Sequence, residues 1–164
     1  MYKRLAAVIL CTCCFTTQPA FADGWLFGGK VAYFEADVAN ADDPDNAGLV
    51  LGYDWSKDYG ILGIQGDVTT TFEDGSVAGE TISVDTLGVY ATYKTRGASA
   101  QGLGAYLLLK GGAMYYDLNV GSTTRDETDP AYGIGVGVNM GYVSFELDYT
   151  AVDDFEMVSF SVLF

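Results

Sequence analysis

The stretch Tyr132–Gly141, YGIGVGVNMG, decides the fold class of this 164-residue chain. Its apolar residues Ile134, Val136 and Val138 stand at even positions, and glycines stand at most of the odd ones. A period of two residues is that of a β-strand, whose successive side chains point to opposite faces. The segment therefore predicts a strand with one apolar face and one face of small or polar residues.

The same alternation recurs from Trp25 to the end of the chain. It marks eight segments, at about residues 25–33, 49–56, 62–72, 82–95, 103–115, 132–141, 143–149 and 158–164. No stretch after residue 22 carries the apolar stripe of a helix. The sequence therefore predicts an all-β domain of eight strands.

The predicted connections alternate between long acidic segments and short turns. The acidic ones are residues 37–47, 73–81, 119–130 and 151–156, and the short ones are 57–60, 96–100 and 141–142. Long loops at one end and tight turns at the other are typical of up-and-down antiparallel barrels of the outer membrane. The acidic runs Asp42–Asn46, Asp126–Asp129 and Asp153–Glu156 are interpreted as solvated loop tips, with divalent-cation binding as the alternative.

Alternation alone does not tell which face is outside, because a soluble lipocalin-like barrel has the same period. A soluble wall needs long polar residues, yet only six lysines and arginines follow residue 22. Aromatic residues stand near the expected strand ends, as in the two girdles of a membrane barrel. They are Trp25, Tyr33, Tyr53, Trp55, Phe72, Tyr149 and Phe164. We therefore predict an eight-stranded antiparallel up-and-down transmembrane β-barrel, closed so that no strand edge meets hydrocarbon.

In this orientation several charged residues point into the barrel. They are Lys30, Asp54, Asp67, Lys110, Glu146 and Asp148. Ions removed from water are costly unless they are paired, so the two lysines are expected to bridge to some of the four carboxylates. Bulky residues share this face, namely Tyr90, Tyr106, Leu108 and Met114. The prediction is a closed lumen filled by a polar network; the alternative is a narrow channel for small or cationic solutes.

The first 22 residues have the pattern of a cleaved signal peptide. Lys3 and Arg4 precede a short apolar run that ends in the small-residue motif Ala20-Phe21-Ala22. The predicted domains are thus a signal peptide, residues 1–22, and a barrel, residues 23–164. All three cysteines lie in the first segment, so no disulfide is expected in the barrel.

Composition excludes several classes of function. A formal net charge of −14 is opposite to the basic footprint of a nucleic-acid-binding protein. The chain has no histidine, which removes the usual acid–base group and a common metal ligand. We expect no enzyme activity, no cofactor and no metal site.

The C-terminal strand carries apolar residues at alternate positions, Val158, Phe160, Val162 and Phe164. This pattern resembles the signature by which the bacterial barrel assembly machinery recognises its clients, and residues 132–149 resemble the last hairpin of small OmpA-like, OmpX-like and opacity-type barrels. The resemblance implies an integral protein of the Gram-negative outer membrane, delivered by periplasmic chaperones. We expect it to be a monomer in contact with lipid and lipopolysaccharide. The resemblance does not imply one activity, since the group includes adhesins, structural barrels and small channels. We expect a structural or surface-interaction role through acidic extracellular loops, with the narrow channel as the alternative.

Overall fold

The computed structural model describes residues 24–36, 43–57, 60–95, 99–100, 103–153 and 155–164. The strands are β1 (Gly24–Ala36), β2 (Asp45–Lys57), β3 (Gly60–Glu73), β4 (Gly75–Val77), β5 (Glu80–Lys94), β6 (Ser99–Ala100), β7 (Leu103–Val120), β8 (Thr123–Met140), β9 (Val143–Ala151) and β10 (Phe155–Leu163). No helix in the described part of the chain is long and apolar enough to cross a membrane.

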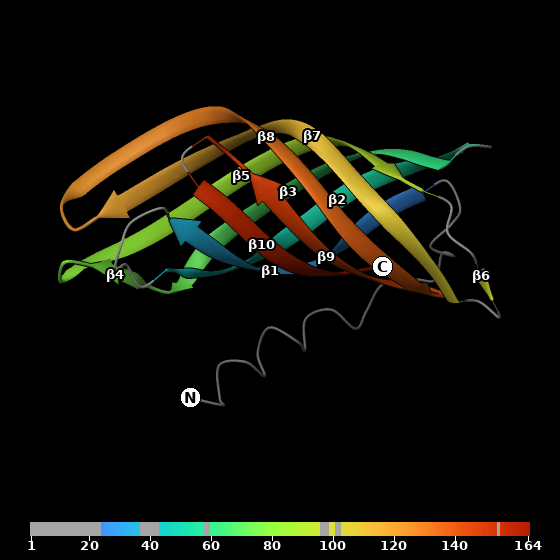
Figure 1. The fold of residues 1–164 in the computed structure, drawn as a ribbon, viewed down its shortest axis with the longest axis horizontal. Helices are drawn as coiled ribbons and strands as arrows, with labels where there is room; N and C mark the ends of the chain where they lie inside the picture. Colours follow the sequence, from blue (N-terminus) through green and yellow to red (C-terminus); the bar gives the residue numbers. More distant parts are fainter. Residues whose placement is uncertain (1–23, 37–42, 58–59, 96–98, 101–102, 154) are drawn as a thin grey trace.

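Eight of these strands form one closed antiparallel barrel (Figure 1). The order around it is β1, β2, β3, β5, β7, β8, β9 and β10, and β10 returns to β1. The closing pair aligns Lys30 with Ser161, and Phe27 and Phe164 exchange backbone hydrogen bonds at its end. The predicted eight-stranded up-and-down barrel is confirmed. The short strands β4 and β6 extend hairpins at the two ends.

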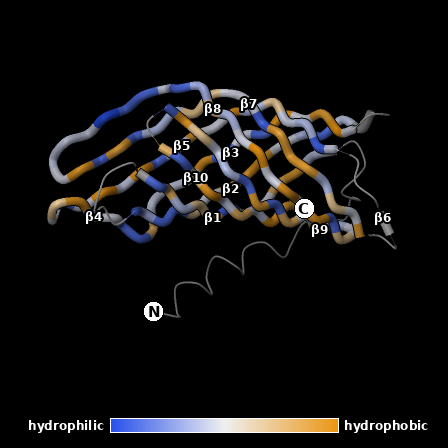
Figure 2. The backbone as a smooth tube through the Cα atoms, in the orientation of Figure 1, coloured by the Kyte–Doolittle hydropathy of each residue, from blue (hydrophilic) through white to orange (hydrophobic). Residues whose placement is uncertain are grey.

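The side chains divide as the alternation predicted. Large apolar residues face outward on every barrel strand, and Leu51, Val136 and Phe160 keep 57%, 51% and 41% of their surface exposed. The intervening residues are buried inside, and hydrophobic and hydrophilic stretches alternate along the strands (Figure 2). The apolar face is therefore the outer wall.

The loop end differs from the prediction, because two of the expected acidic loops are strands. Residues 119–130 belong to a hairpin of two 18-residue strands, β7 and β8, joined by a two-residue turn at Gly121. Residues 75–82 form a second hairpin, in which Ala78 and Gly79 both have positive φ angles, 51° and 88°. Both hairpins carry the sheet beyond the rest of the barrel (Figure 1).

The other predicted connections are partly described. The turn at Gly141-Tyr142 is confirmed, whereas most of the turns at 57–60 and 96–100 and residues 37–42 lie outside the described residues. The connection from β9 to β10 spans residues 152–154 and is shorter than the predicted 151–156. At its ends, the Val152 N–H donates a hydrogen bond to the Phe155 carbonyl oxygen. Asn46, expected at an acidic tip, instead lies in β2 with its side chain buried in the barrel and bonded to Thr69.

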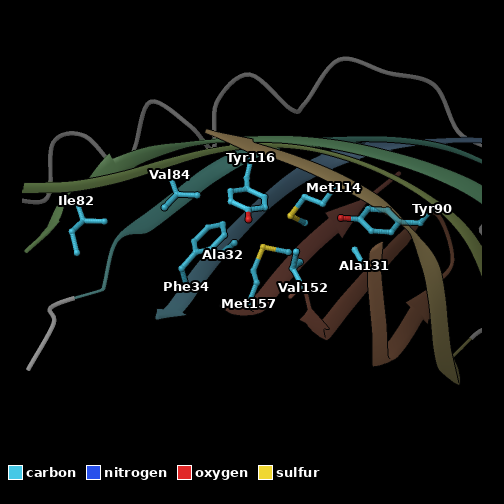
Figure 3. Packing of buried hydrophobic residues seen from close by; sticks show 10 residues of the cluster. All are labelled: Ala32, Phe34, Ile82, Val84, Tyr90, Met114, Tyr116, Ala131, Val152 and Met157. Carbon is cyan, nitrogen blue, oxygen red and sulfur yellow. The ribbon is translucent and has the colours of Figure 1, made fainter. Parts of the chain in front are cut away.

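The loop-end part of the lumen holds an apolar cluster, in addition to the polar network that was predicted inside the barrel. Phe34, Val84, Met114, Tyr116 and Met157 pack together across the bore (Figure 3). These residues come from strands on opposite sides of the barrel, so the cluster lies across the lumen at this level. Met114 was predicted on this face, whereas Phe34, Tyr116 and Met157 lie just outside the bounds of the expected strands. The inward parity nevertheless continues through Phe34 and Met157.

Candidate functional site: the barrel interior and its loop end

All six charged residues assigned to the lumen from the sequence are buried inside the barrel. Lys30 Nζ lies 2.6 Å from Asp67 Oδ2, and the two side chains have no exposed surface. Lys30 is on β1 and Asp67 on β3, so the pair reaches past the intervening strand β2. Lys110 forms an ion pair with Asp148, whose second oxygen accepts a hydrogen bond from Ser159 Oγ at 2.7 Å.

Lys94 is a third buried cation, which was not among the residues expected in the lumen. Its Nζ lies 3.0 Å from Asp54 Oδ2 and 3.0 Å from Glu146 Oε1, so it joins two of the predicted carboxylates. The Tyr106 hydroxyl donates a 2.7 Å hydrogen bond to the same Glu146 oxygen. The alternation along β5 could have predicted Lys94 in the lumen, because it stands two residues after Thr92 and four after Tyr90, which both face inward.

The three ion-pair groups explain how charge is tolerated inside a barrel within a membrane. Each lysine whose side chain is described has at least one carboxylate partner: Lys30, Lys94 and Lys110. Lys110 Nζ also lies 4.8 Å from the centre of the Tyr90 ring, and Lys94 Nζ 5.5 Å from that of Tyr106. These contacts offset the loss of hydration that an isolated ion would suffer.

Glycines on the inner wall make room for the large lumen side chains. A Cβ atom built on Gly137 would collide with the Tyr106 ring, and one on Gly135 would come within 2.7 Å of the Asp148 Cβ and the Leu147 carbonyl oxygen. The glycines of the run Tyr132–Gly141 therefore form a stretch of inner wall that leaves space for large side chains from neighbouring strands. It is a strand followed by a turn and another strand, unlike a phosphate-binding loop, which opens a helix.

We predict that Gly137→Ala destabilises the barrel by about 1–3 kcal/mol, the usual cost of overpacking. The added methyl group would displace the Tyr106 ring and weaken its hydrogen bond to Glu146. Gly29→Ala is the matched control, because a Cβ there meets no atom within 4 Å. Denaturant unfolding in lipid vesicles measures both; equal midpoints for the two variants would contradict the packing argument.

The charged side chains that the structure describes outside the lumen lie at the loop end. The described carboxylates there belong to Glu35, Asp43, Asp45, Glu73, Asp74, Glu80, Asp85, Asp117, Asp126, Glu127, Asp129, Asp153 and Glu156. Among side chains described at this end, Arg125 is the sole cation, and it binds Glu127 at 2.7 Å. The strand register also places Asp85, Asp117 and Asp126 side by side on β5, β7 and β8. Like charges directly opposite each other are destabilising, so this face favours cations.

The predicted assembly residues lie on the last strand, β10, and at its end. Val158 and Phe160 face outward, and the Phe164 ring stacks on Phe27 of β1 with a 5.9 Å separation of ring centres. Among the described residues, no group of three or more acidic or other metal-binding side chains is placed to hold a metal ion.

Comparisons with known proteins agree with this architecture. The family model described as "Outer membrane protein beta-barrel domain" matches residues 5–162. Among curated proteins, no significant match is found.

Three solved structures have the same fold. The attachment invasion locus protein Ail of Yersinia pestis is 19% identical with a TM-score of 0.53, covering 85% of this chain and 93% of Ail. Neisserial surface protein A is 11% identical with a TM-score of 0.56, covering 85% and 94%. OprG of Pseudomonas aeruginosa is 11% identical with a TM-score of 0.53, covering 91% and 99%. At these identities the likeness concerns the fold.

Proposed function

Because the chain belongs to the outer membrane protein beta-barrel family and is an outer-membrane protein, we propose that it acts as a closed barrel that presents an acidic surface to cationic partners outside the cell. The observation that carries this proposal is the filled lumen. Leu108 and Met114 have no exposed surface, and the apolar cluster lies on the loop-end side of the ion pairs. With the bore filled, the parts available for function are the outer wall and the loop end.

The acidic loop end supports a surface role. The β4–β5 and β7–β8 hairpins project beyond the barrel, and loops of such barrels face the exterior. Charge of one sign steers partners of the opposite sign and repels those of the same sign. We therefore expect a polycation, and not a sulfated polyanion, to bind this face.

The experiment compares binding of polylysine and dextran sulfate to the barrel reconstituted in neutral lipid vesicles. The barrel should bind polylysine in a salt-sensitive manner and should not bind dextran sulfate. A variant with Asp85, Asp117 and Asp126 changed to Asn should bind polylysine about tenfold more weakly, which corresponds to a loss of about 1.4 kcal/mol in binding free energy. Asp153→Asn, a single exposed charge near β10, is the control. Equal polylysine binding by all variants would overturn the proposal.

A narrow channel is the second candidate. Its supporting observation is that several buried polar atoms have no hydrogen-bond partner among the described residues; Asp67 Oδ1, the Tyr90 hydroxyl and Ser161 Oγ are among them. Such atoms are usually satisfied by water. Planar-bilayer recordings separate the candidates: a closed barrel gives no sustained current, whereas steady cation-selective steps would establish the channel instead.

We also propose that residues 1–22, which lie outside the described residues, are a cleaved signal peptide, and that Val158, Phe160, Val162 and Phe164 direct assembly by the barrel assembly machinery after transfer by periplasmic chaperones. Lipid and lipopolysaccharide are the proposed surroundings of a monomeric, non-catalytic barrel. The absence of histidine from the chain supports the non-catalytic role.

The assembly proposal predicts that Phe164→Ser sharply lowers the amount of folded barrel in the outer membrane of cells. The purified variant should still refold in vesicles, because spontaneous refolding does not require a recognition signal. Phe27→Ser is the matched control, since it removes the other ring of the same stacked pair. Heat-dependent gel mobility of outer-membrane fractions measures folding; equal losses for the two variants would contradict a role in recognition.

A further inference from the structure

The outer wall of the barrel has a hollow on one side. It extends over β1, β2, β3 and β5 and has a volume of about 990 Å³. Its outward-facing lining is apolar, with Leu51 near the middle and Trp25, Tyr53 and Trp55 at the turn end. Asp67 contributes to the lining, but its carboxylate points inward to Lys30.

Two outward-facing glycines line this hollow. Gly29 and Gly66 face outward on β1 and β3, on either side of β2, where Gly29 is opposite Leu49 and Gly66 is opposite Leu51. A Cβ on Gly29 would meet no atom within 4 Å, and one on Gly66 would come no closer than 3.6 Å to any neighbour. Gly28, by contrast, faces the lumen, and a Cβ there would collide with the Val162 carbonyl. Packing inside the barrel therefore does not require glycine at positions 29 and 66.

We propose that the hollow holds one acyl chain of a phospholipid from the periplasmic leaflet of the outer membrane. The hollow is continuous with the lipid-facing belt, whose exposed apolar residues include Val136 and Phe160 on other strands. Its aromatic end lies at the short-turn side of the barrel, which faces the periplasm in this class of protein. Tryptophan and tyrosine rings occupy the headgroup level of a membrane, so a chain anchored there would run along the hollow toward the bilayer centre.

The driving force for this binding is packing. Water is absent from the bilayer core, so an apolar surface gains nothing by leaving lipid for protein. A hollow that the surrounding lipid leaves unfilled loses the dispersion contacts of its lining. A flexible hydrocarbon chain can follow the space above Gly29 and Gly66, and it therefore recovers these contacts without any rearrangement of the barrel.

The two tryptophans of the chain provide the test, because Trp25 and Trp55 both line the hollow and no other tryptophan is present. The full chain is reconstituted in phosphatidylethanolamine vesicles brominated on the acyl chains, where bromine quenches tryptophan fluorescence. It is then transferred to micelles of an unbrominated detergent. The native barrel should retain part of the quenching, because the bound lipid exchanges slowly.

Gly29→Leu fills the hollow and should lose at least half of the retained quenching; Gly66→Leu is a second variant of the same kind. Gly111→Leu is the control, since Gly111 also faces outward but lies on β7, beside Tyr132. Quenching before transfer and heat-dependent gel mobility should be the same for all variants, which shows that each one folds. Complete loss of quenching from the native barrel, or equal retention by Gly29→Leu, would overturn the proposal. So would a dimer in the micelles that Gly29→Leu converts to a monomer, because the occupant would then be a second copy.

Discussion

Replacing Lys94 by methionine should destabilise the barrel by about 3–5 kcal/mol, the usual cost of removing one partner of a buried ion pair. The loss is expected at the upper end of this range, because Lys94 lies between two carboxylates, Asp54 and Glu146. Without the lysine, both acids remain inside the barrel and lose their cation. Among the described residues, Glu146 keeps a hydrogen bond from the Tyr106 hydroxyl.

Denaturant unfolding in phospholipid vesicles measures this effect, with Trp25 and Trp55 as the fluorescent reporters. The midpoint should fall without a change in the slope of free energy against denaturant. A triple variant that also carries Asp54→Asn and Glu146→Gln should recover most of the loss, because no unpaired ion is then left in the lumen. A loss below about 1 kcal/mol for Lys94→Met alone is the value of a surface ion pair and would contradict a dry interior.

The second large effect concerns the outer wall. Val136→Arg should destabilise the folded state by about 2–4 kcal/mol, the cost of a cation on the lipid face of a barrel near the membrane midplane. Val136 lies in the middle of the outward apolar run of β8, between Leu107 and Leu147 on the neighbouring strands. Burying a guanidinium group among acyl chains removes its hydration without supplying a partner.

Thr128→Arg is the matched control, since Thr128 is exposed on the same strand but lies beyond its outward apolar run. Its effect should stay within about 0.5 kcal/mol, as for ordinary surface substitutions. The two variants are compared by unfolding in vesicles at equal lipid concentration. A neutral Val136→Arg variant would mean that the apolar wall is in contact with water.

The fold was predictable because its dominant force leaves a periodic trace in the sequence. Along Tyr132–Gly141, lipid on one side and a crowded lumen on the other select different residue types at every second position. The same parity is sufficient to place Lys30, Asp67 and Asp148 inside the barrel. It would also have placed Lys94 there, had the irregular strand at 82–95 been followed to its end.

The prediction was wrong where the chain leaves the membrane. Residues 123–129 of β8 are exposed or half-buried and polar, since lipid no longer selects an apolar face there. The charged residues of this segment and the proline at position 130 are typical of a loop, although strand pairing continues to the turn at Gly121. The pairing between Lys94 and two acids from distant strands was equally hidden, because it depends on how the barrel closes.

The central claim is that the apolar face of the barrel contacts lipid, and site-directed spin labelling measures this directly. Single cysteines are placed at Leu51, Val136 and Phe160 on the outer wall and at Gln65 and Ser159 in the lumen, with Cys11, Cys13 and Cys14 replaced by serine. In bilayers, labels at the first three positions should collide freely with dissolved oxygen and rarely with a polar nickel reagent, whereas the lumen labels should be shielded from both. High nickel collision rates at Leu51, Val136 and Phe160 would contradict a lipid-facing apolar wall.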